Sequence, residues 1–145
     1  MPEGFVSVKR GFEIFDHTAD VGVVAYGDDV AEAFANAARG LFSLITEPGS
    51  IRGITWRDTE LAAPDEESLL VDWLNELIYL FDVEKLVFRR FEVDIFPGFR
   101  LKAKSYGERV DKNKHPLKTG VKAATYHMLN IERGEKCRVK VIFDI

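Results

Sequence analysis

The last two positions of the chain carry two anionic groups at the end of an apolar segment. Residues 139–145 are apolar apart from Lys140 and Asp144. This pattern predicts a final β-strand tied into a sheet. The Asp144 side chain then lies one residue from the α-carboxylate of Ile145. Carboxylates held in a partly buried place are costly unless a proton, a basic partner or a cation compensates them. A frayed chain end is the simpler alternative.

A second group of polar side chains lies in the segment Asp16-His17-Thr18-Ala19-Asp20, which contains carboxylates and an imidazole. In one regular strand, Asp16, Thr18 and Asp20 would share a side and His17 would point the opposite way. The structural alternative is that Asp16 and Thr18 bind turn backbone and that His17 is an interior histidine. Asp20 differs from the others because a mostly apolar run follows it directly.

These two groups form one site only if Asp20 approaches the chain end. In that case the carboxylates of Asp20, Asp144 and Ile145 converge and offer oxygen donors without any sulfur. Such donors suit Ca²⁺, Mg²⁺ or Mn²⁺ better than a structural zinc ion. The sequence therefore predicts a divalent-cation site that depends on a long-range contact.

A third group of titratable residues surrounds the polar segment 107–119, which predicts a loop. Loops on a rigid scaffold often carry function. The structural alternative is that Glu108 and Lys122 pair with neighbours, while Tyr126 and His127 divide between core and surface. The chain contains no Ser-His-Asp order, glycine-rich phosphate loop or His-Glu-x-x-His zinc motif. The members of this group are Glu108, Asp111, His115, Lys122 and His127.

Two amphipathic helices are expected to support these groups. Apolar residues recur at steps of three and four over residues 30–45, after a cap at Asp28 or Asp29 and before a stop at residues 48–49. A wider apolar stripe covers residues 69–81, behind a start with acidic groups at the positive end of the helix dipole. Its width predicts that the second helix is the more buried of the two.

Short stretches rich in β-branched and aromatic residues predict the strands. Residues 97–98 predict a hairpin between two of them, and a helical start at residues 121–124 is an alternative to the strand there. Helices among mostly consecutive strands predict an α+β fold, a single domain of mainly antiparallel sheet with two principal helices packed on one face. The predicted strands contain Phe12 and Ile14, Val21 to Tyr26, Ile54 to Leu61, Leu86 to Phe88, Phe91 to Phe96, Phe99 to Ala103, Val121 to Ile131 and Cys137 to Ile145.

The charge of the chain is unevenly distributed along the sequence. The 145 residues carry 20 basic and 24 acidic side chains, a net charge of −4 that excludes a uniformly basic nucleic-acid binder. Residues 1–99 hold 8 basic and 19 acidic side chains (−11), and residues 100–145 hold 12 and 5 (+7). A basic C-terminal third would favour a phosphate-bearing or acidic partner, unless its lysines merely solvate strand faces.

Composition also bears on the compartment. Hydrophobic residues make up 46% of the chain, enough for one sizeable core. A lone Cys137 forms neither an internal disulfide nor a Cys-based zinc site, and the first residues lack the pattern of a signal peptide. The longest apolar runs fall short of the roughly 20 residues that a membrane helix needs. We therefore expect a cytoplasmic protein without a membrane span.

Taken together, these motifs resemble the archease family from about Phe12 to the last residue. Each motif is short, so the resemblance rests on their order, their spacing and the shared chain end. One position differs, because the family usually has an acidic residue where Gly120 stands, so no role of that acidic position carries over. The motifs are Asp16-His17-Thr18-Ala19-Asp20-Val21-Gly22, Trp73-Leu74-Asn75-Glu76-Leu77 with Tyr79, Gly107-Glu108 with Asp111 and His115, Val121-Lys122-Ala123 with Thr125-Tyr126-His127, and Val141-Ile142-Phe143-Asp144-Ile145.

The resemblance implies a single archease-like domain over residues 1–145 with no catalytic residue of its own. Archeases are understood as protein cofactors of the tRNA-splicing RNA ligase, which joins 2′,3′-cyclic or 3′-phosphate ends to 5′-hydroxyl ends. They promote guanylylation of the ligase and its multiple turnover, and they broaden the nucleotides it accepts. The family's metal site carries over onto Asp20, Asp144 and the terminal carboxylate of Ile145, with calcium favoured. The implied partner is the ligase, with tRNA reached through it.

Two other hypotheses come from different classes. A chaperone-like module would use the basic C-terminal third to bind RNA or protein, and its RNA affinity would fall steeply with salt. A metal-dependent hydrolase would use Asp20, His17 and Asp144 to hold a metal that acidifies water. Turnover of phosphoesters by the purified chain alone would favour the hydrolase.

Overall fold

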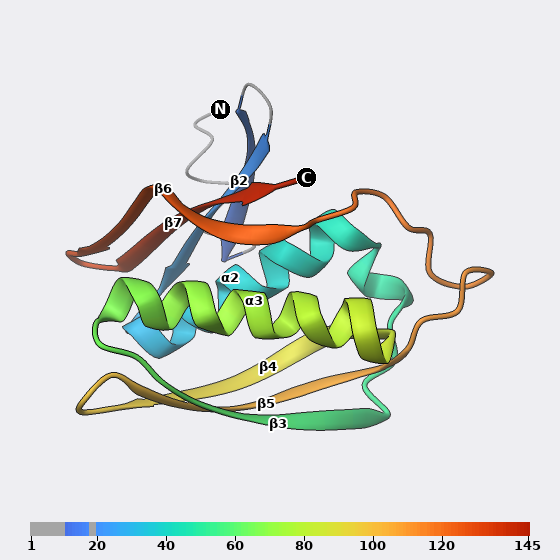
Figure 1. Ribbon diagram of the computed structural model, residues 1–145, viewed down its shortest axis with the longest axis horizontal. Helices are drawn as coiled ribbons and strands as arrows, with labels where there is room; N and C mark the ends of the chain where they lie inside the picture. The colour runs from blue at the N-terminus through green and yellow to red at the C-terminus, as the bar shows by residue number, and fades with distance from the viewer. Residues whose placement is uncertain (1–10, 18–19) are drawn as a thin grey trace.

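The computed structural model describes residues 11–17 and 20–145 of the chain. Within these residues, two α-helices lie between two antiparallel sheets (Figure 1). One sheet has the strand order β1-β2-β7-β6, with β1 (Phe12–His17), β2 (Asp20–Gly27), β7 (Cys137–Asp144) and β6 (Ala123–Arg133). The other has the order β3-β5-β4, with β3 (Thr55–Ala62), β5 (Arg100–Arg109) and β4 (Leu86–Phe96). The predicted α+β class is confirmed, and the division into two sheets is an added feature.

Both predicted helices form, and each begins at an aspartate cap. The Asp29 side chain accepts a hydrogen bond from the Glu32 N–H at the start of α2 (Val30–Ile45). Asp65 accepts one from Ser68 at the start of α3 (Glu66–Glu84). These bonds satisfy N–H groups that the first turn of a helix leaves without partners. A short 3₁₀ helix, η1 (Pro48–Ser50), follows α2.

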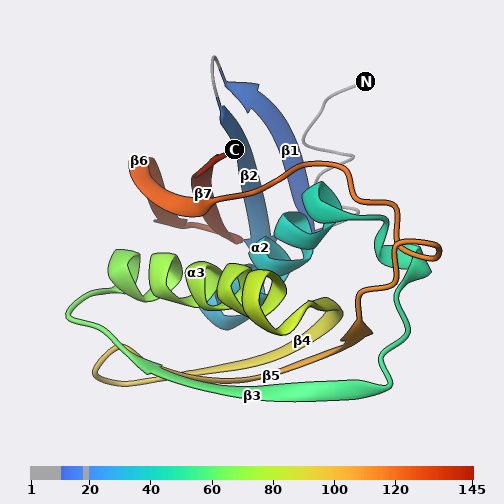
Figure 2. The same ribbon diagram turned by 45° about the vertical axis from the view of Figure 1, so that its right-hand side comes forward.

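The expectation that the second helix is the more buried one is wrong. A larger share of α2 is buried, because α2 packs against β1, β2 and β7 on one side and against β4 on the other. Figure 2 shows both helices between the sheets, with α3 between β6 on one side and β3, β4 and β5 on the other. Small residues permit the close approach of α2, since a Cβ at Gly40 would lie 2.7 Å from Val23. Stripe width records apolar content, whereas burial depends on how extensively the neighbouring strands cover the helix.

One cluster of buried side chains joins both sheets and both helices in the described part of the chain. At its centre, Phe42 stacks on Phe91 with ring centroids 5.9 Å apart, and Trp73 meets the same ring edge-on at 6.1 Å. The Trp73 indole N–H donates to the carbonyl of Phe34, which satisfies its polar group inside the core. This shared core fixes α2 and α3 relative to the sheets.

Several strand boundaries differ from the predicted ones. The segments 86–88 and 91–96 form one strand, β4, with an irregularity between Phe88 and Arg90. β5 continues to Arg109, so the predicted loop begins later than residue 107. The hairpin at residues 97–98 is confirmed, with Gly98 at φ +86°. The helical alternative at residues 121–124 is wrong, because β6 begins at Ala123 and pairs with β7.

No helix in the described part of the chain is long and apolar enough to cross a membrane. The single domain over residues 1–145 stays a prediction, because residues 1–10 lie outside the described part.

Candidate functional site

The β2–β7 ladder places Asp20 directly opposite Asp144. Residues opposite one another in an antiparallel pair share a face, with Cβ atoms about 4.5–5.5 Å apart. The predicted approach of the early aspartate to the chain end is therefore confirmed. Like charges at this spacing destabilise a sheet, so the pair is compensated best by a positive charge.

Asp144 is held from both sides of its strand. β2 lies on one side, and on the other side Asp144 pairs with Ala123 of β6. The backbone N–H of Lys122 donates to the Asp144 carbonyl at 2.8 Å. The alternative of a frayed chain end is therefore wrong for residues up to Asp144. The carboxylate of Ile145 lies one residue beyond the last paired position of β7.

The pair lies on the face of the sheet that points away from the helices. Its neighbours in the ladder, Val21 and Phe143, are buried in the core, and strand side chains alternate between faces. Asp20 is half-buried, while Asp144 and Ile145 are exposed. Figure 2 shows the chain end beside β2 at one end of the sheet. A partner macromolecule can therefore approach these carboxylates without any movement of the core.

The expected grouping of Asp16 with Asp20 is wrong. The chain reverses between them, so that His17 pairs with Asp20 and Asp16 pairs with Val21. Asp16 thus belongs to the neighbouring row of the ladder, whose side chains point to the opposite face. Even spacing in sequence loses this meaning when a hairpin intervenes. Thr18 and the side chain of His17 lie outside the described part of the structure.

The donor chemistry at the chain end fits a hard divalent cation. The side chains of Asp20 and Asp144 are carboxylates, and the main chain of Ile145 ends in a third. Oxygen donors of this kind suit Ca²⁺, Mg²⁺ and Mn²⁺. Over residues 11–17 and 20–145, no three or more His, Cys, Asp or Glu side chains gather into a metal-binding group. The terminal carboxylate of Ile145 stays the expected third donor, and metal binding here stays a prediction.

A side chain on α3 completes the support of β6. Asn75 accepts a hydrogen bond from the Ala124 N–H at 2.8 Å, and its amide group lies 3.5 Å from the Ala124 carbonyl. Ala124 is adjacent to Ala123, the partner of Asp144, so Asn75 anchors the strand that flanks the chain end. Asn75 belongs to one of the motifs quoted above, where the residue pattern assigns it no role. The sequence signal for a structural role was a single amide side chain among the apolar residues of the second helix, because such a group needs a hydrogen-bond partner there.

Replacing Asn75 by Ala removes both of these contacts and leaves the polar backbone groups of Ala124 without their side-chain partner. We expect a loss of about 1–3 kcal/mol in the free energy of unfolding, measured by urea denaturation. Asn75→Asp keeps an acceptor for the N–H and loses the donor, so its loss should be smaller. Wild-type stability of Asn75→Ala would show that the anchor contributes nothing.

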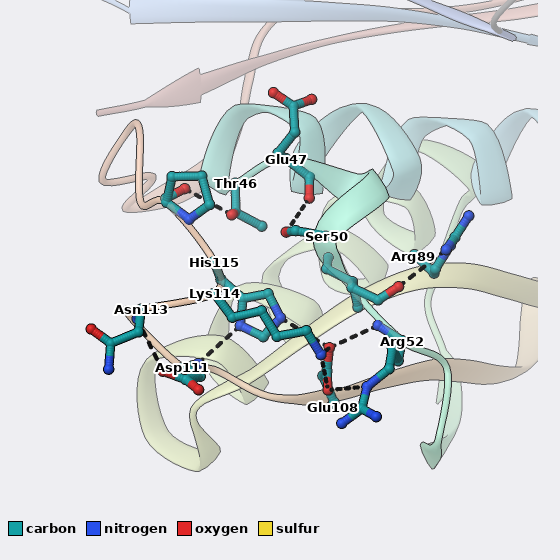
Figure 3. A network of polar contacts seen from close by, with 12 residues as sticks. Thr46, Glu47, Ser50, Arg52, Arg89, Glu108, Asp111, Asn113, Lys114 and His115 are labelled. Atoms are coloured by element: carbon teal, nitrogen blue, oxygen red, sulfur yellow. Dashed lines mark hydrogen bonds and ion pairs between the residues drawn. The ribbon is translucent and has the colours of Figure 1, made fainter.

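A second polar cluster surrounds the buried carboxylate of Glu108, at the end of β5 (Figure 3). Glu108 accepts hydrogen bonds from the backbone N–H of Arg52 at 2.7 Å and from the Lys114 ammonium at 2.8 Å. The His115 ring lies 2.9 Å away through Nε2, and its Nδ1 accepts the N–H of Asp111. Nδ1 therefore carries no hydrogen, and Nε2–H donates to Glu108.

These contacts control the ionisation of Glu108. Burial alone raises the pKa of its carboxyl group, but hydrogen bonds from Lys114, the Arg52 backbone and His115 outweigh burial and lower the pKa to about 2. The carboxylate is thus charged at neutral pH and acts as a fixed acceptor. His115 is fully buried, so this cluster ties the loop after β5 to the segment after η1.

The structure divides the third group of the sequence analysis between two places. Glu108, Asp111 and His115 come together, in agreement with the structural alternative of pairing between neighbours. Lys122 contributes its backbone N–H at the chain end. Tyr126 and His127 are both exposed on β6, so the expected division of this pair between core and surface is wrong. Gly120 is also exposed, with no atom within 4 Å of a Cβ built there, so the fold would accept a side chain at this position.

Comparison with known proteins identifies relatives over most of the chain. Residues 12–145 match the model of the Archease protein family. The chain is 40% identical over 144 residues to protein archease of Methanosarcina acetivorans, covering 96% of this chain and 99% of the relative. It is 45% identical over 129 residues to protein archease of Pyrococcus abyssi, covering 87% and 90%. The solution structure of Methanobacterium thermoautotrophicum protein 1598 matches with a TM-score of 0.82 and 36% identity, covering 94% of this chain and 99% of that one.

Proposed function

Because this chain belongs to the archease family, we propose that it activates the tRNA-splicing RNA ligase through its carboxylate-bearing end. Family membership makes it a protein cofactor and not a catalyst, which removes the hydrolase hypothesis. The proposal extends this to one partner, the ligase, and to three effects on it, namely guanylylation, multiple turnover and broadened nucleotide use. A cytoplasmic location also stays a prediction.

One observation carries the proposal, the pairing of Asp20 with Asp144 next to the terminal carboxylate. Two strands fix the backbone of this pair, so little conformational entropy is lost when the carboxylates act together. The pair faces away from the core, where a partner can reach it. Two carboxylates set directly opposite one another at the edge of the core fit a role in binding a positively charged group.

The chain's own residues present and orient the site. β7 holds Asp144, β2 holds Asp20, and the N–H of Lys122 fixes the last peptide carbonyl. When bound, a divalent cation supplies positive charge close to the partner's reacting phosphates, where positioning and charge neutralisation dominate nucleotidyl transfer. The chain also stabilises the productive conformation of the ligase if it binds that conformation preferentially.

A ligation assay with limiting ligase tests the proposal. RNA with 2′,3′-cyclic phosphate and 5′-hydroxyl ends is incubated with the ligase, guanosine triphosphate and divalent cation, with and without this chain. We expect many product molecules per ligase with the chain and about one or fewer without it. Equal product with and without the chain contradicts the proposed function.

Extending the chain end gives a matched pair of variants. One Gly added after Ile145 turns the terminal carboxylate into an amide, so we expect a loss of stimulation of about 10-fold or more. One Gly added before Met1 changes the chain length equally and should leave stimulation unchanged. Stimulation that survives the C-terminal addition at its full level argues against a role for the terminal carboxylate.

The charge asymmetry does not favour the RNA-binding alternative. Basic side chains of the C-terminal third form ion pairs with acidic residues from earlier in the chain. These pairs neutralise much of the +7 counted along the sequence. The pairs are Lys102 with Glu60, Lys104 with Asp58, Lys118 with Glu47, Arg133 with Glu66, and Lys136 with Asp28.

A further inference from the structure

Strand β6 is interrupted beside the candidate site. Thr125 pairs with Ile142 and Asn130 pairs with Lys140, so β6 advances five residues while β7 advances two. The additional residues leave the ladder, and Tyr126, His127 and Met128 are all exposed. We call these three residues the β6 ridge. The exposed fractions of Tyr126 and Met128 are 57% and 50%, so two large side chains lie close together on the surface here.

The β6 ridge holds a strained backbone conformation. Met128 has φ +53°, in the left-handed region that residues other than Gly, Asn and Asp rarely adopt. Thr125 supports the ridge, because its hydroxyl donates to the Ile142 carbonyl and accepts the His127 N–H. Strain of this kind persists when surrounding contacts determine it, and it concentrates at functional sites. Bulges next to such sites re-aim side chains.

The β6 ridge also lies close to the carboxylate pair. Thr125 pairs with Ile142, which is two residues from Asp144 on the same face of the sheet. The ridge follows Thr125 and ends before Asn130, the partner of Lys140, so it lies two to four residues of strand from Asp144, roughly 7–13 Å. Figure 1 shows that β6 changes direction partway along its length, next to β7, the strand that leads to the chain end. A partner that reaches Asp20 and Asp144 therefore has the β6 ridge within its footprint.

We propose that the β6 ridge is a protein-contact surface that docks the chain onto the ligase beside the carboxylate pair; this rests on the proposed function. Tyr and Met are enriched in protein interfaces, where large side chains carry much of the binding energy. The ridge contains no Lys or Arg, the residues that RNA binding requires to neutralise phosphates. Its chemistry therefore fits an apolar pocket on a protein.

Two ridge variants test the proposal, each with a matched control on the far sheet. Tyr126→Ala is compared with Trp56→Ala, whose ring is 51% exposed on β3. Met128→Gly is compared with Phe99→Gly, because Phe99 is exposed at φ +54° in the β4–β5 hairpin. Both Gly substitutions relieve the same backbone strain, so unfolding of the protein is not expected to confound them.

Binding to the purified ligase is measured by calorimetry without RNA, and cation binding to each variant alone is measured in parallel. We expect the ligase affinity to fall about 10-fold or more in both ridge variants and to stay at the wild-type level in both controls. Cation affinity and the urea midpoint should not fall in Tyr126→Ala or Met128→Gly. The half-maximal concentration for stimulation should rise with the ligase dissociation constant.

The outcomes separate this inference from the proposed function. Ridge variants that bind the ligase as tightly as wild type overturn the inference and leave the proposed function intact. An equal loss in the ridge variants and their controls also overturns it. So does a ridge-dependent affinity for RNA in the absence of ligase, because the surface would then serve nucleic acid. A wild-type chain that binds no ligase overturns the proposed function and the inference together.

Discussion

We expect Asp20→Asn and Asp144→Asn each to lose cation binding at the chain end, by about 100-fold or more in affinity, and with it stimulation of the ligase. Asn has nearly the shape of Asp, so the substitution removes one negative charge and leaves the strand pairing in place. Neighbouring strands hold the backbone at both positions. The loss is therefore chemical and leaves the fold unchanged.

The same variants should become more stable when no cation is present. The two carboxylates lie directly opposite one another, a placement of like charges that destabilises a sheet by about 0.2–1 kcal/mol. Removing either charge relieves this repulsion. Wild type, in contrast, gains stability as cation is added, because only the folded state holds the site. Wild type and variant should therefore exchange their order of stability as the cation concentration rises.

Thermal unfolding with and without Ca²⁺, together with calorimetric titration, measures both effects. Asp58→Asn is the matched control, since Asp58 is an exposed aspartate on the other sheet. The control should respond to Ca²⁺ as wild type does. A cation response of the same size in Asp20→Asn or Asp144→Asn excludes these two carboxylates as ligands. Stimulation of the ligase by both folded variants at the wild-type level would overturn the proposed role of the site.

Glu108→Gln should destabilise the folded protein by about 2–4 kcal/mol at neutral pH. The buried carboxylate accepts hydrogen bonds from the Arg52 backbone, the Lys114 ammonium and the His115 ring. Gln replaces one acceptor oxygen by an amide donor, which would face donors that are already in place. It also leaves the Lys114 ammonium without its opposite charge. Chemical denaturation at pH 7 measures the difference.

The acid sensitivity of folding should change in the same variant. The pKa of Glu108 is lowered to about 2 from the ordinary 4.5, so the folded state binds this proton more weakly than the unfolded state. The contribution of the Glu108 carboxylate to the free energy of unfolding is therefore fully present above about pH 4.5 and is lost as the pH falls towards 2. A shift of this size corresponds to about 3 kcal/mol. Wild type should lose this contribution on acidification, whereas Glu108→Gln has no such contribution to lose.

Glu60→Gln provides the control for this prediction, because Glu60 lies exposed on β3 and pairs only with Lys102 across the strands. Exposed pairs of this kind contribute about 0–1 kcal/mol. The control should unfold as wild type does at both pH 7 and pH 3. If Glu108→Gln and Glu60→Gln had the same free energy of unfolding, the buried cluster would have no special role in stability.

Local features of the fold follow from local residue patterns. Both helices begin at the aspartates that precede their apolar stripes, and the turn at residues 97–98 joins the strands expected to flank it. Each depends on interactions within a few residues, such as a cap that accepts the N–H three positions on. The prediction of which helix is more buried was wrong because burial depends on long-range contacts, and the strands that cover α2 come from distant segments of the chain.

Most of the support around the candidate site lies beyond sequence patterns. Asn75 anchors Ala124 from another element, and the ion pairs that neutralise the basic C-terminal third join residues far apart in the chain. The β6 ridge exists because β6 and β7 advance unequally, which no single strand reveals. The hairpin after Asp16 likewise reverses the face that alternation alone predicts for Asp20.

The sequence by itself determined which groups are available, namely Asp20 beside an apolar strand and the adjacent carboxylates of Asp144 and Ile145. Composition and spacing are sufficient for that, because side-chain chemistry and the approximate strands are local properties. Only the tertiary structure decided that these groups meet, because the β2–β7 register joins residues from the two ends of the chain. Register is set by which faces enter the shared core, and a shift of either strand by one residue would turn the carboxylate of that strand towards the helices.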